Sequence, residues 1–250
     1  MRLVVIGATG RTGGEIVAEA TERGHDVVGV ARSAGEVGDV PVHPARELPG
    51  LLAGADGLLL ISPYYNRPEP DGTERHFRTI ADAVDLPQII YNVPGRTGRN
   101  IAVESAVALA EHENIVGYKA ASGDLGRTNE VVERTRDENF GVLSGDDALT
   151  LPVVAQGGTG CISVAANVEP DRVVALVGSA LAGDFERARE LQYELGDLFR
   201  VLFAESNPMP VNEAMEMRGV HSATMRSPLC PLQPETRERL RAVLDDLERE

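Results

Sequence analysis

The sequence predicts an α/β fold of the (β/α) TIM-barrel type, incomplete at about seven strands and followed by a C-terminal helical extension. Apolar strand patterns alternate with amphipathic helical patterns as far as residue 167, which indicates a parallel sheet built from βα units. Beyond that residue the pattern is helical only. With 250 residues, 42% of them hydrophobic, the chain is long enough for one large α/β domain or two small ones.

The expected elements alternate along the chain. Strands are expected at 2–7, 26–31, 57–62, 88–93, 115–120, 141–145 and 160–166. Helices are expected at 12–23, 45–54, 73–84, 101–112, 126–137, 169–181, 184–204, 209–218 and 234–249. A complete eight-unit barrel takes about 250 residues. A chain whose last strand ends near residue 166 therefore lacks about one unit, and we place the deficit near the N-terminus.

Three segments follow from these patterns. Residues 1–52 form a Rossmann-like βαβ segment in place of the first barrel units, residues 53–168 form the barrel units that carry the polar strand ends, and residues 169–250 form a helical region. The two strands of the first segment are apolar. We expect them to pair in parallel and to fill part of the gap in the barrel.

The charge balance limits the classes of partner. The chain has 39 acidic and 24 basic residues, a net charge of −15, which argues against unaided nucleic-acid binding because phosphate contacts need a basic face. The acidic residues are spread over the whole chain, which suggests a solvated acidic surface of the kind suited to a high-salt cytoplasm. The longest apolar runs, such as Leu58–Ile61, fall far short of the roughly 18 residues of a membrane-spanning helix.

The N-terminal pattern and the cysteines predict the compartment. Residues 1–7 give a buried strand pattern and not a secretory signal. Two cysteines, Cys161 and Cys230, make neither a disulfide framework nor a metal cluster. We therefore expect a reduced, cytoplasmic protein with no metal site.

Lys119 is the only lysine among the 24 basic residues. A surface lysine can be replaced by arginine at little cost. A lysine that acts as an amine nucleophile cannot, because a guanidinium stays protonated and forms no Schiff base. Lys119 lies inside an apolar strand pattern, where a charge is costly unless it has a function. We interpret Lys119 as a nucleophile.

A glycine-rich turn near the N-terminus is typical of dinucleotide sites. Gly7, Gly10 and Gly13 follow a strand and open a helix, which lets the backbone approach a pyrophosphate. Arg32, after the second strand, suits a 2′-phosphate and so favours NADP over NAD. The spacing resembles that of NADP-binding reductases, including dihydrodipicolinate reductase, over about the first 50 residues. A glycine-rich turn that binds no nucleotide is the alternative.

Polar clusters fall at the carboxyl ends of successive strands, where barrel enzymes hold their active sites. They are Ser62–Pro68, Tyr91–Gly98, Gly117–Ala120, Leu143–Asp147 and Gly160–Asn167, with Asn207–Val211 in the helical tail. Strand alternation places Tyr91 on the same face of its strand as Ile89, and Lys119 on the same face as Gly117. Since neighbouring strands lie about 4.8 Å apart, we expect the Tyr91 phenol beside the Lys119 amine. Gly117 is expected to leave space for a small substrate.

From about Leu52 to the end, the chain resembles the dihydrodipicolinate synthase family, part of the class I aldolase superfamily that includes N-acetylneuraminate lyase. The resemblance implies that Lys119 forms a Schiff base with pyruvate, that Tyr91 is the acid/base, and that Tyr65 joins a proton relay across a subunit interface. It also implies that Ile162, through its backbone, and Gly145 line the substrate pocket.

Arg96 discriminates among the substrates that this superfamily uses. The resemblance implies that Arg96 binds the carboxylate of L-aspartate 4-semialdehyde, by a bidentate pair. The implied reaction is the condensation of pyruvate with that aldehyde in lysine and diaminopimelate biosynthesis, by a homo-oligomer that needs no cofactor. The alternatives are a 2-keto-3-deoxy sugar-acid aldolase, an NADP-binding reductase fragment, and an inactive fusion remnant.

The chain departs from the family pattern at three places. The family's threonine turn, which binds the pyruvate carboxylate, is absent from the expected place, where the reductase-like segment stands. Ala120 replaces a glutamate and Asn212 replaces a lysine. The lost turn predicts impaired activity.

Overall fold

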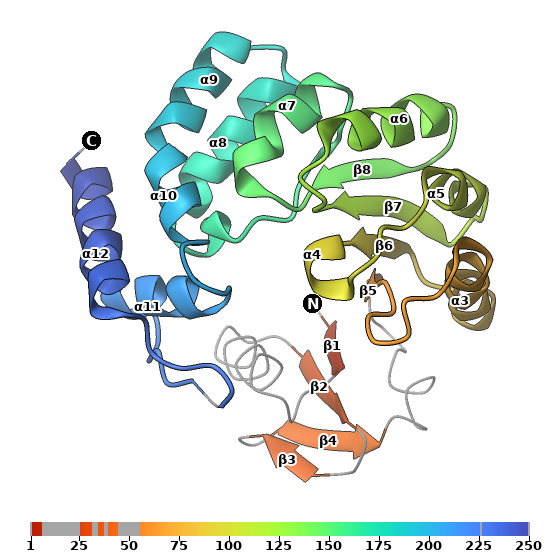
Figure 1. The fold of residues 1–250 in the computed structure, drawn as a ribbon, viewed down its shortest axis with the longest axis horizontal. Coiled ribbons are helices and arrows are strands. Elements are labelled where there is room, and N and C mark those ends of the chain that lie inside the picture. The colour runs from red at the N-terminus through yellow and green to blue at the C-terminus, as the bar shows by residue number, and fades with distance from the viewer. Residues whose placement is uncertain are drawn as a thin grey trace. The chain divides into compact units, whose positions relative to one another are not determined.

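The computed structural model describes residues 2–6, 26–31, 35–37, 40–44, 56–225 and 227–249, with side chains from residue 56 onward. The chain divides into two compact units: residues 1–58 with 82–87, and residues 59–81 with 88–250. Most strands and helices of each unit are labelled in Figure 1.

The first unit contains a four-stranded sheet. Its strands are β1 (Arg2–Ile6), β2 (Asp26–Ala31), β3 (Gly35–Val37) and β4 (Val40–Pro44), in the order β1-β2-β4-β3. Strands β1 and β2 pair in parallel, as the sequence predicts, and β2 pairs in parallel with β4. The antiparallel pair β3–β4 was not predicted. The sequence signal for this pair is the Gly-Asp dipeptide between the two short strands, a pair of residues typical of hairpin loops.

A second sheet has five strands in sequential order. They are β5 (Leu58–Ile61), β6 (Gln88–Asn92), β7 (Ile115–Ala120), β8 (Gly141–Ser144) and β9 (Gly160–Cys161). Strands β6 to β9 pair in parallel, and the Ser62 amide beyond β5 donates to the Tyr91 carbonyl of β6. Sequential parallel strands with a helix after each are the arrangement predicted from the sequence.

The helices that accompany this sheet are α3 (Pro70–Ala83), α4 (Pro94–Thr97), α5 (Val103–Ala110), α6 (Leu125–Thr135) and α7 (Thr150–Ala155). In Figure 1, α5 and α6 lie along β7 and β8, against which they pack. The short helices α4 and α7 were not predicted. In α7, Pro152 interrupts the helical pattern, but it lies in the first turn, where a missing N–H costs nothing.

The chain ends in five helices: α8 (Pro170–Leu181), α9 (Phe185–Glu194), α10 (Gly196–Val201), α11 (Met209–Met217) and α12 (Pro234–Arg249). The sequence predicted one helix over 184–204, and the structure divides it at Leu195–Gly196. Glycine inside a helix is unfavourable, and here it opens the second helix. The predicted helices over 169–181, 209–218 and 234–249 agree with α8, α11 and α12 to within a residue.

Strand β9 is shorter than the expected span 160–166. The Ile162 amide still donates to the Ser144 carbonyl of β8, but Val164 N and Ala165 N both donate to Asp147 Oδ2, at 3.1 and 3.0 Å, so the strand does not continue to residue 166. The chain then turns into the 3₁₀ helix η3 (Ala165–Asn167). A carboxylate that captures two backbone amides cannot be recognised from strand periodicity.

Two apolar clusters support the second unit. One joins the sheet to its helices and includes Phe77, Ile90, Leu109 and Tyr118. The other fills the space among the C-terminal helices and includes Leu176, Leu198 and Leu240. Alternate residues of β6 are buried, which fixes the side on which Tyr91 lies.

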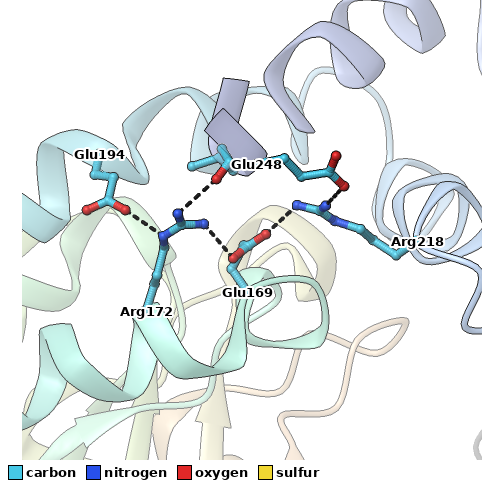
Figure 2. A network of polar contacts seen from close by, with 6 residues as sticks. Glu169, Arg172, Glu194, Arg218 and Glu248 are labelled. Atoms are coloured by element: carbon cyan, nitrogen blue, oxygen red, sulfur yellow. Dashed lines mark hydrogen bonds and ion pairs between the residues drawn. The ribbon is translucent and has the colours of Figure 1, made fainter. Parts of the chain in front are cut away.

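An ionic network ties the C-terminal helices together, as Figure 2 shows. Arg172 of α8 lies 2.8 Å from Glu169 and 2.5 Å from Glu194, and Arg218 lies 2.5 Å from Glu169. Arg218 also binds Glu248 of α12, while Arg172 donates to the Leu247 carbonyl. Four helices, α8, α9, α11 and α12, are thereby cross-linked around one carboxylate, that of Glu169.

Candidate active site

Lys119 and Tyr91 meet at the carboxyl ends of neighbouring strands. The two residues are register partners across β6 and β7, and Lys119 Nζ lies 4.3 Å from the centroid of the Tyr91 ring. The predicted juxtaposition of amine and phenol is therefore confirmed. The face of the Tyr91 ring therefore borders the amine, and a cation at this position is weakly stabilised.

The two groups have shifted pKa values for different reasons. Burial lowers the pKa of Lys119, while the charge of Asp147 and, less strongly, that of Cys161 oppose the shift. Burial raises the pKa of Tyr91, against the opposing charge of Arg96. Lys119 therefore supplies more of the neutral, nucleophilic amine at a given pH than an exposed lysine, and the Tyr91 phenol keeps its proton.

Gly145, which the sequence assigned to the substrate pocket, lies against the side chain of Lys119. A Cβ added at Gly145 would lie 2.7 Å from Lys119 Cε and 2.9 Å from Cγ. The Gly145 amide donates to the Ala120 carbonyl at 2.7 Å. The lysine can adopt its position because residue 145 has no side chain.

Gly117 has a different neighbourhood from the one predicted. A Cβ at this position would lie 2.9 Å from the Gly141 carbonyl oxygen and 3.3 Å from Ile89 Cγ1. Its missing side chain therefore permits close approach of β7 and β8, and the expectation that it leaves space for a substrate was wrong. Sequence alternation gave the face of the residue but not its cross-strand neighbour.

Arg96 lies on the short helix that follows β6. The helix begins after Val93, whose carbonyl accepts from the Arg96 and Thr97 amides, and ends at Gly98 with φ 75°. Arg96 Nη2 donates to the Asn207 carbonyl at 2.9 Å. The guanidinium is thus fixed between the β6 end and the segment before α11, close enough to Tyr91 to act on its pKa.

Asn92 organises the same turn, and no role was predicted for it. Its Nδ2 donates to Asn100 Oδ1, and its Oδ1 accepts from the Ile101 amide, both at 2.9 Å. The side chain is fully buried. Its position directly after Tyr91 was the only available signal.

Tyr65 lies on the loop between β5 and α3 and is 89% exposed. The loop is held at its far end, where Arg99 lies 2.6 Å from Glu69 and also donates to the Pro68 carbonyl. An exposed phenol on an anchored loop is consistent with the expected role at a subunit interface, which stays a prediction.

Residues at the β8 and β9 ends complete the surroundings of Lys119. The Ile162 amide donates to the Ser144 carbonyl at 2.8 Å, which places Ile162 at the strand end where the sequence expected it. Cys161 is half-buried, and burial raises the pKa of its thiol, against a hydrogen bond with Thr150. The sequence places Asp147 and Cys161 in the polar clusters expected at these strand ends, but no individual role was predicted for either.

The candidate nucleotide residues Gly7, Gly10, Gly13 and Arg32 lie outside the described residues. Among the described residues, no group of three or more His, Cys, Asp or Glu side chains is placed to hold a metal ion. In the same part of the chain, no helix is long and apolar enough to cross a membrane.

Taken together, sequential parallel strands and a lysine–tyrosine pair at their carboxyl ends define an α/β protein of the TIM-barrel class with a strand-end amine site. The dihydrodipicolinate synthetase family model matches residues 11–247. The chain belongs to that family. The match begins well before Leu52, where the resemblance was expected to start, and the reductase resemblance of the first segment gains no support from it.

Relatives and solved structures agree with this assignment. The 4-hydroxy-tetrahydrodipicolinate synthase of Natronomonas pharaonis is 82% identical over 197 residues, 79% of this chain and 67% of the relative. That of Haloarcula marismortui is 61% identical over 198 residues, 79% of this chain and 65% of the relative. The chain spans about two thirds of the length of these curated relatives.

The fold is that of the solved synthases. The dihydrodipicolinate synthase structure from Aquifex aeolicus has 42% identity and a TM-score of 0.82, covering 99% of this chain and 86% of that one. The structure from Thermotoga maritima has 31% identity and a TM-score of 0.79, covering 94% and 91%. The predicted TIM-barrel-type α/β class is therefore confirmed.

Proposed function

We propose that this chain is a pyruvate-dependent lyase that condenses pyruvate with L-aspartate 4-semialdehyde through a Schiff base on Lys119. The observation that carries the proposal is the half-buried amine of the only lysine, 4.3 Å from the centroid of the Tyr91 ring. Family membership and the names of the relatives support the same reaction.

The proposed chemistry begins at the neutral amine. Lys119 Nζ attacks the C2 carbonyl of pyruvate, and the carbinolamine loses water to give a protonated imine. Tyr91 donates the proton that departs with the hydroxyl and accepts protons in later steps. Loss of a C3 proton gives an enamine, whose C3 forms the new carbon–carbon bond at the aldehyde carbon. Attack of the amino group of the bound semialdehyde on the imine carbon then expels Lys119 Nζ, which releases the product and restores the free amine.

Arg96 is proposed to select the acceptor aldehyde. One N–H goes to Asn207, and the planar guanidinium has further donors for a bidentate carboxylate pair. L-aspartate 4-semialdehyde carries that carboxylate next to its amine. The position of Arg96 beside Tyr91 favours this aldehyde over the acceptors of sugar-acid aldolases.

Ile162 and Gly145 are proposed to border the pyruvate pocket, and Tyr65 to act across a subunit interface of a homo-oligomer. The exposure of Tyr65 supports the last proposal. The reaction needs no redox cofactor, because it changes no overall oxidation state. Titration of NADPH fluorescence with the protein tests the separate proposal that the glycine-rich segment binds NADP.

The test is an assay of purified protein with pyruvate and each of two acceptor classes. We expect consumption of pyruvate with L-aspartate 4-semialdehyde and none with sugar aldehydes. Arg96→Lys serves as the matched variant, since it keeps the charge and loses the bidentate geometry. It should raise the KM for the semialdehyde at least about tenfold and leave the KM for pyruvate unchanged. Turnover of a sugar aldehyde in preference to the semialdehyde contradicts the proposal.

A further inference from the structure

Asp147 is a buried carboxylate at the end of β8, in the 3₁₀ helix η2 (Asp147–Leu149), with 2% of its surface exposed. Its Oδ2 accepts from the amides of Val164 and Ala165. The Ser163 side chain also forms a hydrogen bond with this carboxylate. A single oxygen of Asp147 therefore binds both backbone amides.

The backbone that Asp147 holds is part of the site. Val164 and Ala165 follow Ile162, whose own amide is bound to Ser144 of β8. Cys161, just before Ile162, is the register partner of Ser144. The segment Ile162–Ala165 is thus attached to the β8 end at both of its ends, by a strand hydrogen bond and by Asp147.

This attachment lies next to the reacting amine. Gly145 lies two residues before Asp147 and next to the Lys119 side chain. Lys119 of β7 is the register partner of Leu143 on β8, the strand that Gly145 follows. The charges of Asp147 and Cys161 both act on the pKa of Lys119, so the segment that follows Cys161 begins close to the amine. The proposed function places Ile162 of this segment at the border of the pyruvate pocket.

We propose that Asp147 is a positioning residue: its Oδ2 fixes the backbone of Ile162–Ala165 beside Lys119, and this places the wall of the pyruvate pocket. The inference rests on the proposed function for its effect on pyruvate. The attachment of the segment itself does not depend on that function.

The conservative variant Asp147→Asn shows whether Asp147 acts through its hydrogen bonds to the backbone or through its negative charge. In Asp147→Asn, the amide oxygen can accept from both backbone N–H groups, and the NH₂ takes the place of the other carboxylate oxygen. Asp147→Ala removes the acceptor and leaves two amides without a partner, one of them on the fully buried Ala165. Asp146→Ala is the matched control, because the one hydrogen bond found for the Asp146 side chain among the described residues is from the amide of Ala148 in the same turn.

The first measurement is hydrogen–deuterium exchange of the peptide that covers residues 162–166. We expect exchange at least about tenfold faster in Asp147→Ala, and rates within about twofold of the unmodified protein in Asp147→Asn and Asp146→Ala. Should the alanine variant fail to fold, Asp147→Ser takes its place, since a hydroxyl is too short to reach both amides. Unchanged exchange in the truncated variant, or loss of protection in Asp147→Asn, overturns the proposal.

The second measurement is the pyruvate concentration that half-saturates borohydride trapping. We expect it to rise about tenfold in Asp147→Ala, with the limiting trapping rate changed less than threefold, and to be restored in Asp147→Asn. A fall in the limiting rate without a change in half-saturation contradicts a positioning role. If the unmodified protein traps no pyruvate, the proposed function fails, whereas the exchange experiment still decides whether Asp147 holds the segment.

Discussion

Two regions of this protein bury positive charge in opposite ways. At the strand ends, Lys119 is half-buried, and no ion pair of its amine with a carboxylate is found among the described residues. Among the C-terminal helices, the side chains of Arg172 and Arg218 are 24% and 19% exposed, and each binds two carboxylates. The paired arginines and the unpaired lysine therefore have different roles.

The pKa values follow the pairing. Burial works to lower the pKa of Arg172, but hydrogen bonds and charges from Glu169 and Glu194 outweigh it, so the pKa rises. Burial lowers the pKa of Lys119, and the charges of Asp147 and Cys161 do not cancel it. A paired guanidinium holds helices together, whereas an amine with little compensation can lose its proton and react.

Replacing Lys119 with arginine removes the difference between the two regions, because the amine becomes a guanidinium. This substitution should have the largest effect on activity. The guanidinium stays protonated and forms no Schiff base, so we expect turnover to fall at least about 10³-fold and no pyruvate adduct to form. Steady-state kinetics and mass spectrometry measure the two effects. Residual turnover near that of the unmodified protein contradicts the role of Lys119.

Replacing Tyr91 with phenylalanine keeps the ring over the amine and removes the proton donor. We expect a loss of about 10²–10⁴-fold in kcat, the range of general acid–base catalysis, with slow adduct formation retained. Tyr118→Phe on the neighbouring strand is the matched control. Tyr118 is buried and hydrogen-bonded to Asn92, so its loss should cost about 1 kcal/mol of stability and little activity. Equal kcat losses in the two variants count against acid–base catalysis by Tyr91.

Gly145→Ala displaces the amine without changing its chemistry. The added Cβ lies within 3 Å of two carbons of Lys119, so the side chain must move by about 1 Å, and we expect a loss of about 10²-fold in kcat/KM. Gly178→Ala on α8 has open space around the new Cβ and serves as control. Both variants are compared by kinetics and by thermal melting. Unchanged kcat/KM in Gly145→Ala shows that the lysine position tolerates the crowding.

Glu169→Gln removes the carboxylate that Arg172 and Arg218 share. It should not change the surroundings of Lys119. Arg172 and Arg218 each lose a charged partner, which we expect to cost about 2–3 kcal/mol, or about 4–12 °C in Tm. Activity per folded molecule should stay within twofold. Arg200→Ala removes the exposed pair with Asp197 and should change Tm by about 3 °C or less. Equal Tm changes in both variants mean that the network adds nothing beyond surface pairs.

The sequence predicted the region around the amine better than its surroundings. Periodicity and register follow from local alternation, so the meeting of Tyr91 and Lys119 was predictable, as were most of the strands and the longer helices. The roles of Asp147 and Asn92 were not predicted, because their hydrogen-bond partners lie in other segments of the chain, at Val164, Ala165 and Ile101. The short β9 strand was missed for the same reason, since Asp147 ends it from a distance in sequence.

A single unusual residue can thus be identified from the sequence, whereas a network that forms only in the folded chain cannot. The rarity of lysine in this chain is visible in composition, which is enough to single out Lys119. The network around Glu169 depends on tertiary packing of four helices, and arginine and glutamate are common in this chain. No local pattern distinguishes the five residues of that network.

The most direct test of a reactive, weakly compensated amine is borohydride trapping of pyruvate as a function of pH, read by mass spectrometry on the peptide that contains Lys119. The neutral amine is the reactive form, and burial lowers the pKa of Lys119, so trapping should rise with pH and reach half its maximum below the 10.5 of an ordinary lysine. An adduct on Lys119 with that profile is the predicted result. A folded protein that gives no adduct at any pH, or a midpoint at or above 10.5, contradicts the account.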